Sequence, residues 1–113
     1  MANKVTTTPY FESKYKRLSK KFSSLGDELE ELENELKENP ELGTSLGANI
    51  YKVRLASKDK ATGKSGGFRV ITYLVQELDN SYEIFLITIY DKSEESTITK
   101  TVLLKLVKTI FND

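Results

Sequence analysis

Two runs of alternating apolar residues, at positions 50–57 and 67–76, are separated by a connector rich in lysine and glycine. Runs of this length that are rich in Val, Ile, Leu, Tyr and Phe are typical of the paired strands of a β-hairpin. Successive side chains of a strand point to opposite faces, so Lys52 and Arg54 would share one face of the sheet. Arg69 stands inside the second run, where a cation normally requires a partner or a ligand to offset its desolvation. The sequence therefore predicts a small sheet with a cationic face.

The remaining patterns predict a single α+β domain over residues 1–113, because this length suits one domain with one modest core. Helices are expected where leucine and aromatic residues recur every three or four positions, and strands where β-branched residues cluster. In chain order, the expected elements are an edge strand at 3–8, a helix that starts at Thr8 and Pro9, a helix that starts at Ser24 and ends at Asn39, a loop at 41–49, strands at 50–57, 67–76 and 84–90, and an amphipathic helix from Ile98 to the C-terminus.

The two N-terminal helices should pack as an antiparallel αα-hairpin, because the first is basic, the second is acidic and the break between them is short. Their apolar stripes are expected to face the sheet, although a leucine stripe of this kind also suits a partner helix. The run at 84–90 is apolar on both faces, which predicts the central strand. The fold class is therefore α+β: a small twisted antiparallel sheet packed on one face against the helical hairpin, with a C-terminal helix, and with the cations on the other face.

The absence of cysteine and histidine removes several kinds of chemistry. Without cysteine there is no disulfide, thiol nucleophile or cysteine-ligated zinc site, and without histidine the commonest general base and metal ligand is missing. An enzyme of this composition would have to use Lys, Arg, Tyr, Asp or Glu, and we expect neither a metal nor a cofactor. No run of about 20 apolar residues and no signal-peptide pattern occurs, so the expected location is the cytoplasm, with no membrane partner.

The net charge of zero hides a strong separation of charge along the chain. Residues 27–41 carry eight acidic side chains and one lysine, whereas residues 42–75 carry six cations and one aspartate. Cations concentrated around the predicted hairpin indicate a surface that faces a polyanion. The alternative is a solvated surface whose acidic and basic parts merely neutralise each other.

Four cations of the predicted sheet can meet at one place, since Lys52 and Arg54 share a strand, Arg69 lies on the next strand and Lys92 follows the strand at 84–90. Like charges this close are unfavourable unless an anion sits among them, and phosphate suits Lys and Arg well. Cations around a phosphodiester can stabilise the transition state of its cleavage, and a desolvated lysine can act as general base. With the 2′-hydroxyl of RNA as nucleophile, such a reaction needs no metal and leaves DNA intact. By residue types alone, a face that binds nucleic acid without cutting it is the commoner outcome.

Four segments give the chain a resemblance to a known family. They are Thr-Thr-Thr-Pro-Tyr-Phe near the start, Tyr-Lys-Val-Arg-Leu-Ala, Gly-Lys-Ser-Gly-Gly-Phe-Arg-Val-Ile-Thr-Tyr, and Ile-Tyr-Asp-Lys-Ser-Glu after the predicted central strand. In these segments and their order, nearly the whole chain resembles the RelE/HigB toxins, which belong to the RelE/ParE superfamily of bacterial and phage toxin–antitoxin modules. The resemblance implies a RelE-like fold. It also implies a ribonuclease that enters the ribosomal A site, cleaves mRNA and is held inactive by an antitoxin.

The resemblance also implies roles for individual residues at matching positions. Lys52 matches the family lysine proposed as general base, and Arg54 matches a second cation that is often lysine in relatives. Arg69 matches the arginine that stabilises the phosphate in the transition state, and Lys92 stands where relatives place a basic residue that supports the leaving group. The residues expected to contact RNA are Lys58, Lys60, Lys64, Tyr73 and Tyr90.

One departure from the family pattern concerns base stacking. RelE has a tyrosine in its C-terminal segment that stacks on a base, whereas residues 94–113 contain no tyrosine, and the histidines of some HigB-type relatives are absent. Tyr73 or Tyr90 would have to take over the stacking. The group that protonates the leaving 5′-oxygen stays open.

Two functions follow as hypotheses, besides a third, structural hypothesis in which the basic face is only a docking surface for an acidic antitoxin or another partner. The first is the toxin component of a type II toxin–antitoxin module, a ribosome-dependent and metal-free mRNA endoribonuclease that inhibits translation. Its partners would be the ribosome, mRNA and a cognate antitoxin of the helix-turn-helix kind, with DNA contacted only through the antitoxin complex. The second is a toxin-fold protein that does not cut RNA, such as a ParE-type gyrase inhibitor or an inactive antitoxin-binding module. The four cations favour the first hypothesis, since a protein-inhibiting relative does not need them.

Overall fold

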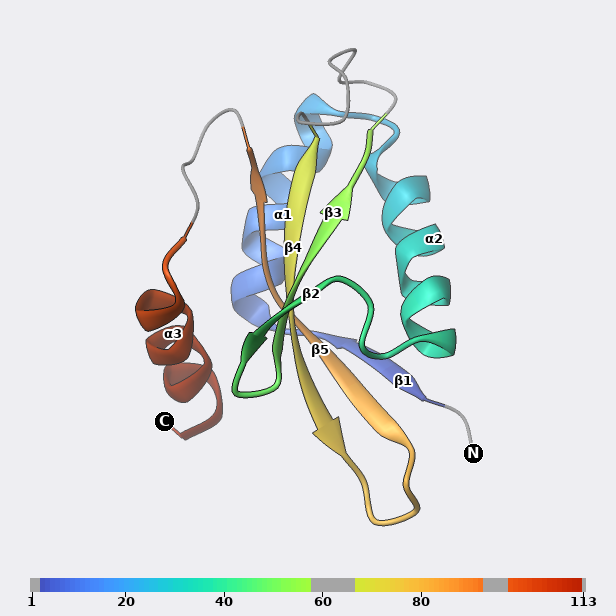
Figure 1. Cartoon of the computed structure of the whole chain (residues 1–113). Helices are drawn as coiled ribbons and strands as arrows, with labels where there is room; N and C mark the ends of the chain where they lie inside the picture. The colour runs from blue at the N-terminus through green and yellow to red at the C-terminus, as the bar shows by residue number, and fades with distance from the viewer. Residues whose placement is uncertain (1–2, 58–66, 93–97, 113) are drawn as a thin grey trace.

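We describe residues 3–57, 67–92 and 98–112 of the computed structural model, which fold around one sheet (Figure 1). The chain begins with a strand, continues with two helices and four further strands, and ends with a helix. The elements are β1 (Lys4–Thr7), α1 (Pro9–Lys21), α2 (Leu25–Glu38), β2 (Thr44–Gly47), β3 (Ile50–Leu55), β4 (Phe68–Gln76), β5 (Tyr82–Asp91) and α3 (Lys100–Asn112).

The sheet has the strand order β1-β5-β4-β3-β2. β1 runs parallel to β5, and the other neighbouring strands are antiparallel. The predicted α+β class and the edge position of β1 are therefore confirmed. The predicted centre of the sheet is wrong by one strand, because β4 lies at the centre and β5 has β1 on its outer side. Both strands are largely buried on both faces, so hydrophobicity alone could not distinguish them.

β2 lies where the sequence predicted a loop at residues 41–49, so that prediction is wrong. Its residues Thr44–Gly47 pair with the first half of β3 through a two-residue turn at Ala48 and Asn49. Both turn residues have positive φ, 55° and 63°, as a type I′ hairpin turn requires. The segment contains a single large apolar side chain, so no alternating pattern marks it, and pairing with β3 alone defines the strand.

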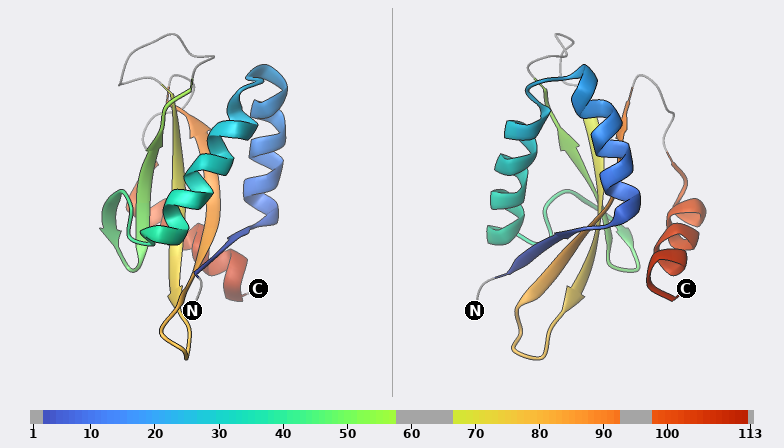
Figure 2. Two further views of the ribbon diagram at one scale, coloured as in Figure 1. Left: turned by 90° about the vertical axis from the view of Figure 1, so that its right-hand side faces the viewer. Right: turned by 180° about the vertical axis from the view of Figure 1, so that it is seen from behind.

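α1 and α2 cover one face of the sheet, with α1 behind it and α2 beside α1 (Figures 1 and 2). α1 begins as predicted, because Thr8 Oγ1 accepts a hydrogen bond from the N–H of Phe11 and Pro9 takes the first helical position. The leucines of α2 pack on the sheet, so the leucine stripe is core and not a surface for a partner helix. The first core consists of Phe11, Leu18, Leu25, Leu29, Leu32, Leu36, Val53, Leu55, Phe68, Val70, Leu74, Ile84, Leu86 and Ile89.

α3 packs on the opposite face, on the far side of the molecule from α2 (Figure 1). Its Leu103 and Val107 are buried in a second core with Ile50, Ile71, Ile87 and Tyr90. Near its C-terminus, the Phe111 ring contacts the rings of Tyr73 and Phe85, with centroids 5.2 and 4.8 Å away. None of the helices in the described ranges is both long enough and apolar enough to cross a membrane.

Thr72 of β4 is a buried polar residue whose hydroxyl is unfavourably placed. It is 0% exposed, and its hydroxyl has no hydrogen-bond partner within the described part of the chain. A buried polar group without a partner costs about 1–3 kcal/mol, and valine has the same shape and a higher strand preference. We expect Thr72→Val to raise the free energy of unfolding by about 1 kcal/mol, measured by urea denaturation.

The matched control is Thr8→Val. The Thr8 hydroxyl donates to the Leu86 carbonyl at 2.9 Å and also caps α1. Its loss should lower the free energy of unfolding by about 1–2 kcal/mol. Equal losses of stability in both variants would show that the hydroxyl of Thr72 is satisfied in solution.

Candidate functional site

The four predicted cations lie on, or directly after, three neighbouring strands of the sheet. Arg54 of β3 is directly opposite Arg69 of β4, and Arg69 is directly opposite Tyr90 of β5. Side chains at paired positions point to the same face. Lys52 lies two residues from Arg54 along β3, so it shares this face too, and Lys92 follows directly after the end of β5 at Asp91. We call Lys52, Arg54, Arg69 and Lys92 the cationic cluster.

The two arginines of the cluster occupy a close pair of positions. The Leu74 N–H donates to the Asn49 carbonyl at 2.9 Å, which fixes the alternation of hydrogen bonds between β3 and β4. By this alternation, the Arg54–Arg69 pair is non-hydrogen-bonded, and Cα atoms in such pairs are only about 4.5 Å apart. Two guanidinium groups that leave the sheet from adjacent positions favour an anion at this place.

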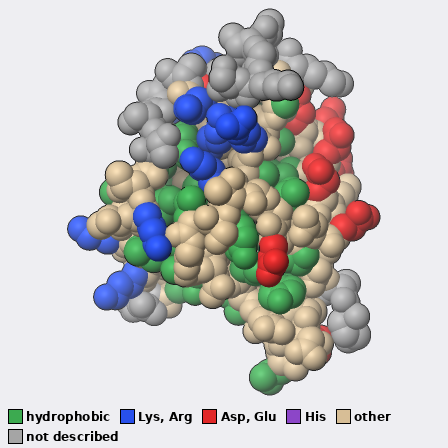
Figure 3. Space-filling view, viewed as in Figure 1, with side chains coloured by type: hydrophobic (Ala, Val, Ile, Leu, Met, Phe, Trp, Pro, Cys, Tyr) green, Lys and Arg blue, Asp and Glu red, His purple; other side chains and the backbone are tan. Residues whose placement is uncertain are grey.

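The members of the cluster differ in exposure. Arg54 and Lys92 are exposed, Lys52 is half-buried, and Arg69 is only 4% exposed. The Nη1 of Arg69 donates to the Phe68 carbonyl at 3.2 Å, which helps to fix the direction of its guanidinium. Figure 3 shows Lys and Arg side chains gathered at one end of the sheet, while Asp and Glu side chains lie beside them over α2. The cluster thus combines one fixed cation with cations that solvent can reach.

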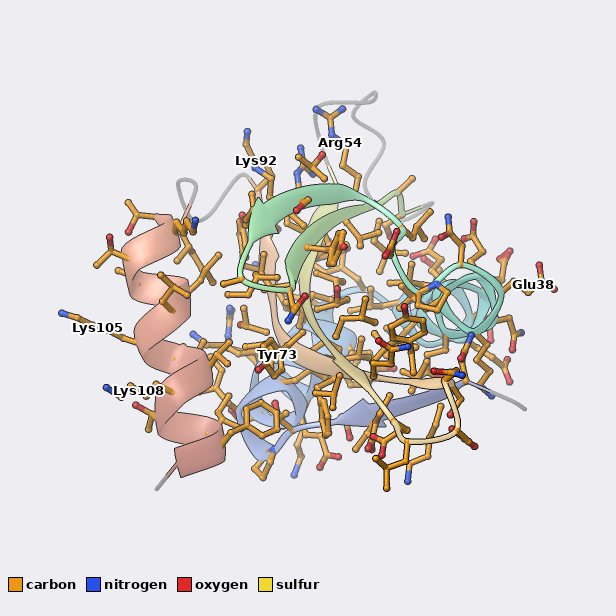
Figure 4. All side chains as sticks on the ribbon, turned by 60° about the horizontal axis from the view of Figure 1, so that its bottom comes forward. Glu38, Arg54, Tyr73, Lys92, Lys105 and Lys108 are labelled. Atoms are coloured by element: carbon orange, nitrogen blue, oxygen red, sulfur yellow. The ribbon has the colours of Figure 1, made fainter. Side chains whose placement is uncertain are left out.

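The side-chain directions on this face separate the cluster from the cations of α3. In Figure 4, Arg54 and Lys92 extend toward the same side of the molecule, whereas Lys105 and Lys108 extend away from α3 in another direction. An extended phosphodiester chain that crosses the ends of β3, β4 and β5 would therefore meet Arg54 and Lys92 and not the α3 lysines.

Gly67 brings the strand ends of the cluster together. Its φ is +81°, and a Cβ at this position would lie 2.7 Å from the Leu55 carbonyl oxygen. Its own carbonyl accepts a hydrogen bond from the Lys92 N–H at 3.2 Å. This glycine therefore permits the close approach of β3, β4 and β5 beside the four cations, because the left-handed conformation and the short contact both exclude a side chain.

The aromatic residues predicted to stack on RNA are occupied by the protein itself. Tyr90 is 2% exposed and belongs to the second core. Tyr73 is half-buried, and Phe111 of α3 packs against its ring. A base needs an open ring face, so the structure gives Tyr90 a packing role, and α3 fills the place beside Tyr73. The sequence could not reveal this, because an aromatic residue on a strand serves equally well in a core or a binding face.

The predicted RNA contacts Lys58, Lys60 and Lys64 lie outside the described residues. Within the described ranges, no group of three Asp or Glu side chains is placed to hold a metal ion. Asp79 lies in the β4–β5 turn, at the other end of the strands from the cluster. Hydrogen bonds from the side chain and backbone of Ser81 hold the pKa of Asp79 below its usual value, so this carboxylate serves the turn.

A groove of about 490 Å³ lies at the outer side of β3, between this strand and α2. α2 contributes Glu28, Glu31, Leu32 and Glu35 to its wall, and the cluster residues Lys52 and Arg54 contribute to the wall from β3. Glu31 and Glu35 were not predicted from the sequence as site residues. The acidic run was visible in the sequence, but the position of these two side chains opposite β3 depends on how α2 packs.

No protein-family model matches the sequence. Among solved structures, the chain is similar to E. coli toxin RelE, in the free state of a mutant with two arginines replaced by alanine. The two share 19% sequence identity at a TM-score of 0.59, and the match covers 98% of this chain and 100% of that chain. The chain therefore has a RelE-like fold over nearly its whole length, which confirms the fold expected from the resemblance.

Proposed function

We propose that this chain is the toxin component of a type II toxin–antitoxin module and that it cleaves mRNA on the ribosome without a metal ion. The observation that carries the proposal is the strand register, which sets Arg54 opposite Arg69 and leaves Lys52 on the same face, with Lys92 directly after the end of β5. The RelE-like fold supports the proposal, because a solved structure with this fold is that of a toxin.

In the proposed reaction, the 2′-oxygen of RNA attacks the adjacent phosphorus while Lys52 takes the 2′-proton as general base. Arg54 and Arg69 hold the non-bridging oxygens, whose negative charge increases in the transition state. The bond from phosphorus to the 5′-oxygen then breaks, and Lys92 stabilises the leaving oxygen until it takes a proton. The products are a 2′,3′-cyclic phosphate and a 5′-hydroxyl. Because DNA lacks the attacking hydroxyl, it would not be cut.

The proposed partners are the ribosome, mRNA and a cognate antitoxin of the helix-turn-helix kind, in the cytoplasm. The exposed Arg54 and Lys92 are accessible both to RNA and to acidic side chains of an antitoxin. Contact with DNA would occur only through the antitoxin complex.

The test is expression of the chain alone in bacteria, followed by mapping of transcript ends. We expect arrested growth and new 5′-hydroxyl ends inside translated reading frames. If such ends were equally frequent in untranslated RNA, cleavage would not depend on the ribosome, and that part of the proposal would be wrong. Intact mRNA together with blocked DNA replication would instead support a ParE-type gyrase inhibitor, and intact mRNA with normal growth an inactive antitoxin-binding module.

The antitoxin proposal needs a separate test. Co-expression of the chain with the product of its neighbouring gene should restore growth, and the two proteins should purify together. Continued growth arrest without a complex would contradict this partner assignment without affecting the cleavage result.

A further inference from the structure

Among the described strands, only β2 lies along the outer edge of β3, and it pairs with the first half of β3. β2 pairs with β3 from Ile50 to Lys52, and no described strand lies beyond Lys52 on this side. Arg54 belongs to a non-hydrogen-bonded pair with β4, so its own N–H and C=O point outward, toward this edge. An uncovered strand edge of this kind is a template for the addition of another strand.

A groove runs beside this part of β3. It follows β3 from Lys52 to Ala56, and Leu42 and Gly43 line one of its ends. Near the other end of the strand, the hydroxyls of Ser24 and Ser57 approach to 3.4 Å. A strand of four residues is about 13 Å long and lies about 4.8 Å from its neighbour. The open segment of β3 therefore suits a short added strand in line with β2.

The two sides of the groove carry opposite charges. On the α2 side, Glu31 and Glu35 are exposed, with Leu32 between them in sequence. On the other side, Arg54 and the half-buried Lys52 belong to the cationic face. Successive residues of an added strand point alternately to these two sides. The complementary segment thus has aliphatic and basic residues toward α2 and acidic residues toward Arg54.

We propose that this groove binds an extended segment of a protein partner, which adds to the open half of β3 with its basic side chains toward Glu31 and Glu35. The backbone of the segment pairs with Arg54, and the carboxylates of Glu31 and Glu35 select its charge pattern. An acidic residue of the segment would lie beside Arg54, so occupancy would also cover one side of the cationic cluster. Strand addition itself does not depend on RNA cleavage.

The test uses a synthetic octapeptide, Val-Thr-Lys-Glu-Val-Thr-Lys-Glu, with blocked ends and the full chain. Titration should give saturable binding, and amide hydrogen exchange should slow at Arg54 when the peptide is bound. A second peptide with lysine and glutamate exchanged has the same composition but the opposite charge on each face. We expect it to bind at least tenfold more weakly.

Two further controls separate strand addition from charge attraction. A peptide N-methylated at the residues that pair with β3 keeps its charges and should lose binding at least tenfold. The variant Glu31→Gln/Glu35→Gln should also bind at least tenfold more weakly, whereas Glu30→Gln/Glu38→Gln, which changes exposed carboxylates that do not line the groove, should bind normally.

Absence of saturable binding, equal binding of the two charge patterns, or unchanged exchange at Arg54 would each overturn the proposal. Because no RNA is present, these outcomes leave the cleavage proposal untouched. Conversely, loss of cleavage activity would not affect the peptide result.

Discussion

Replacement of Lys52 by alanine should lower ribosome-dependent mRNA cleavage by about 10²–10⁴-fold, the usual contribution of a general base. Lys52 lies on the cationic face, two residues from Arg54 and opposite Ile71 of β4. It is half-buried at the strand surface, so its truncation should change the melting temperature little. Cleavage is measured with purified ribosomes and a defined mRNA, and folding is checked by thermal denaturation of the same sample.

The matched control for this loss is Lys105→Ala. Lys105 is an exposed cation of α3 that extends away from the cluster in Figure 4, so its removal changes the net charge equally but leaves the proposed site intact. We expect nearly normal cleavage. If Lys52→Ala and Lys105→Ala were equally active, Lys52 would not be the general base.

A substitution of Arg69 provides a second test of the same site. The variant Arg69→Met keeps much of the side-chain volume but removes the guanidinium, and we expect cleavage to fall by about 10²–10³-fold. Normal cleavage by both Lys52→Ala and Arg69→Met, with the fold retained, would contradict the enzyme proposal as a whole.

Replacement of Gly67 by alanine should lower the free energy of unfolding by about 2–4 kcal/mol, a large part of the stability of a small domain. The backbone of Gly67 is left-handed at φ +81°, and the added Cβ would lie 2.7 Å from the Leu55 carbonyl oxygen. Relief of this contact requires β3 and β4 to move apart beside Arg54 and Arg69. We therefore expect cleavage to decrease at temperatures where the variant is still folded. Urea denaturation and the ribosome assay measure the two effects.

Gly26→Ala is the control for this substitution. Gly26 lies in the first turn of α2, and an added Cβ would approach only the hydroxyl at the end of the Tyr15 side chain, at 3.3 Å. Because alanine favours a helix over glycine, this variant should be as stable as the original or more stable by up to about 1 kcal/mol. Similar stability of Gly67→Ala and Gly26→Ala would show that the strand ends tolerate a side chain at position 67.

The helices and the strands with hydrophobic patterns could be predicted because local rules govern them. α1 begins at Pro9 after the Thr8 cap, α2 ends at Glu38 before Pro40, and β3 and β4 fall within the predicted runs. β2 was missed, because a short polar segment becomes a strand only when a neighbour pairs with it. The central position of β4 was missed because β4 and β5 are both largely buried on both faces. Their hydrophobic patterns therefore do not show how many strands lie on either side of each.

For the candidate site, the sequence predicted that Lys52 and Arg54 share one face of a strand and that Arg69 lies inside the next strand. The proximity of Arg54 and Arg69 could not be predicted, because it depends on which residues of β3 and β4 are paired. The burial of Tyr90 and the contact of Tyr73 with Phe111 depend on where α3 packs. The spacing of apolar residues within α3 predicts a helix, but it does not show where that helix packs on the sheet.

The sequence by itself determined the element types, the face of the cations and the absence of thiol and imidazole chemistry, because each follows from residue identity or from spacing within one element. The tertiary structure decided the register that places Arg54 opposite Arg69. It also decided that β2, among the described strands, pairs with only the first half of β3, and that a groove lies between the rest of β3 and the Glu31 and Glu35 side chains of α2. These features arise from contacts between residues far apart in the chain, where the free energy of packing and pairing selects one arrangement among several that the local pattern allows.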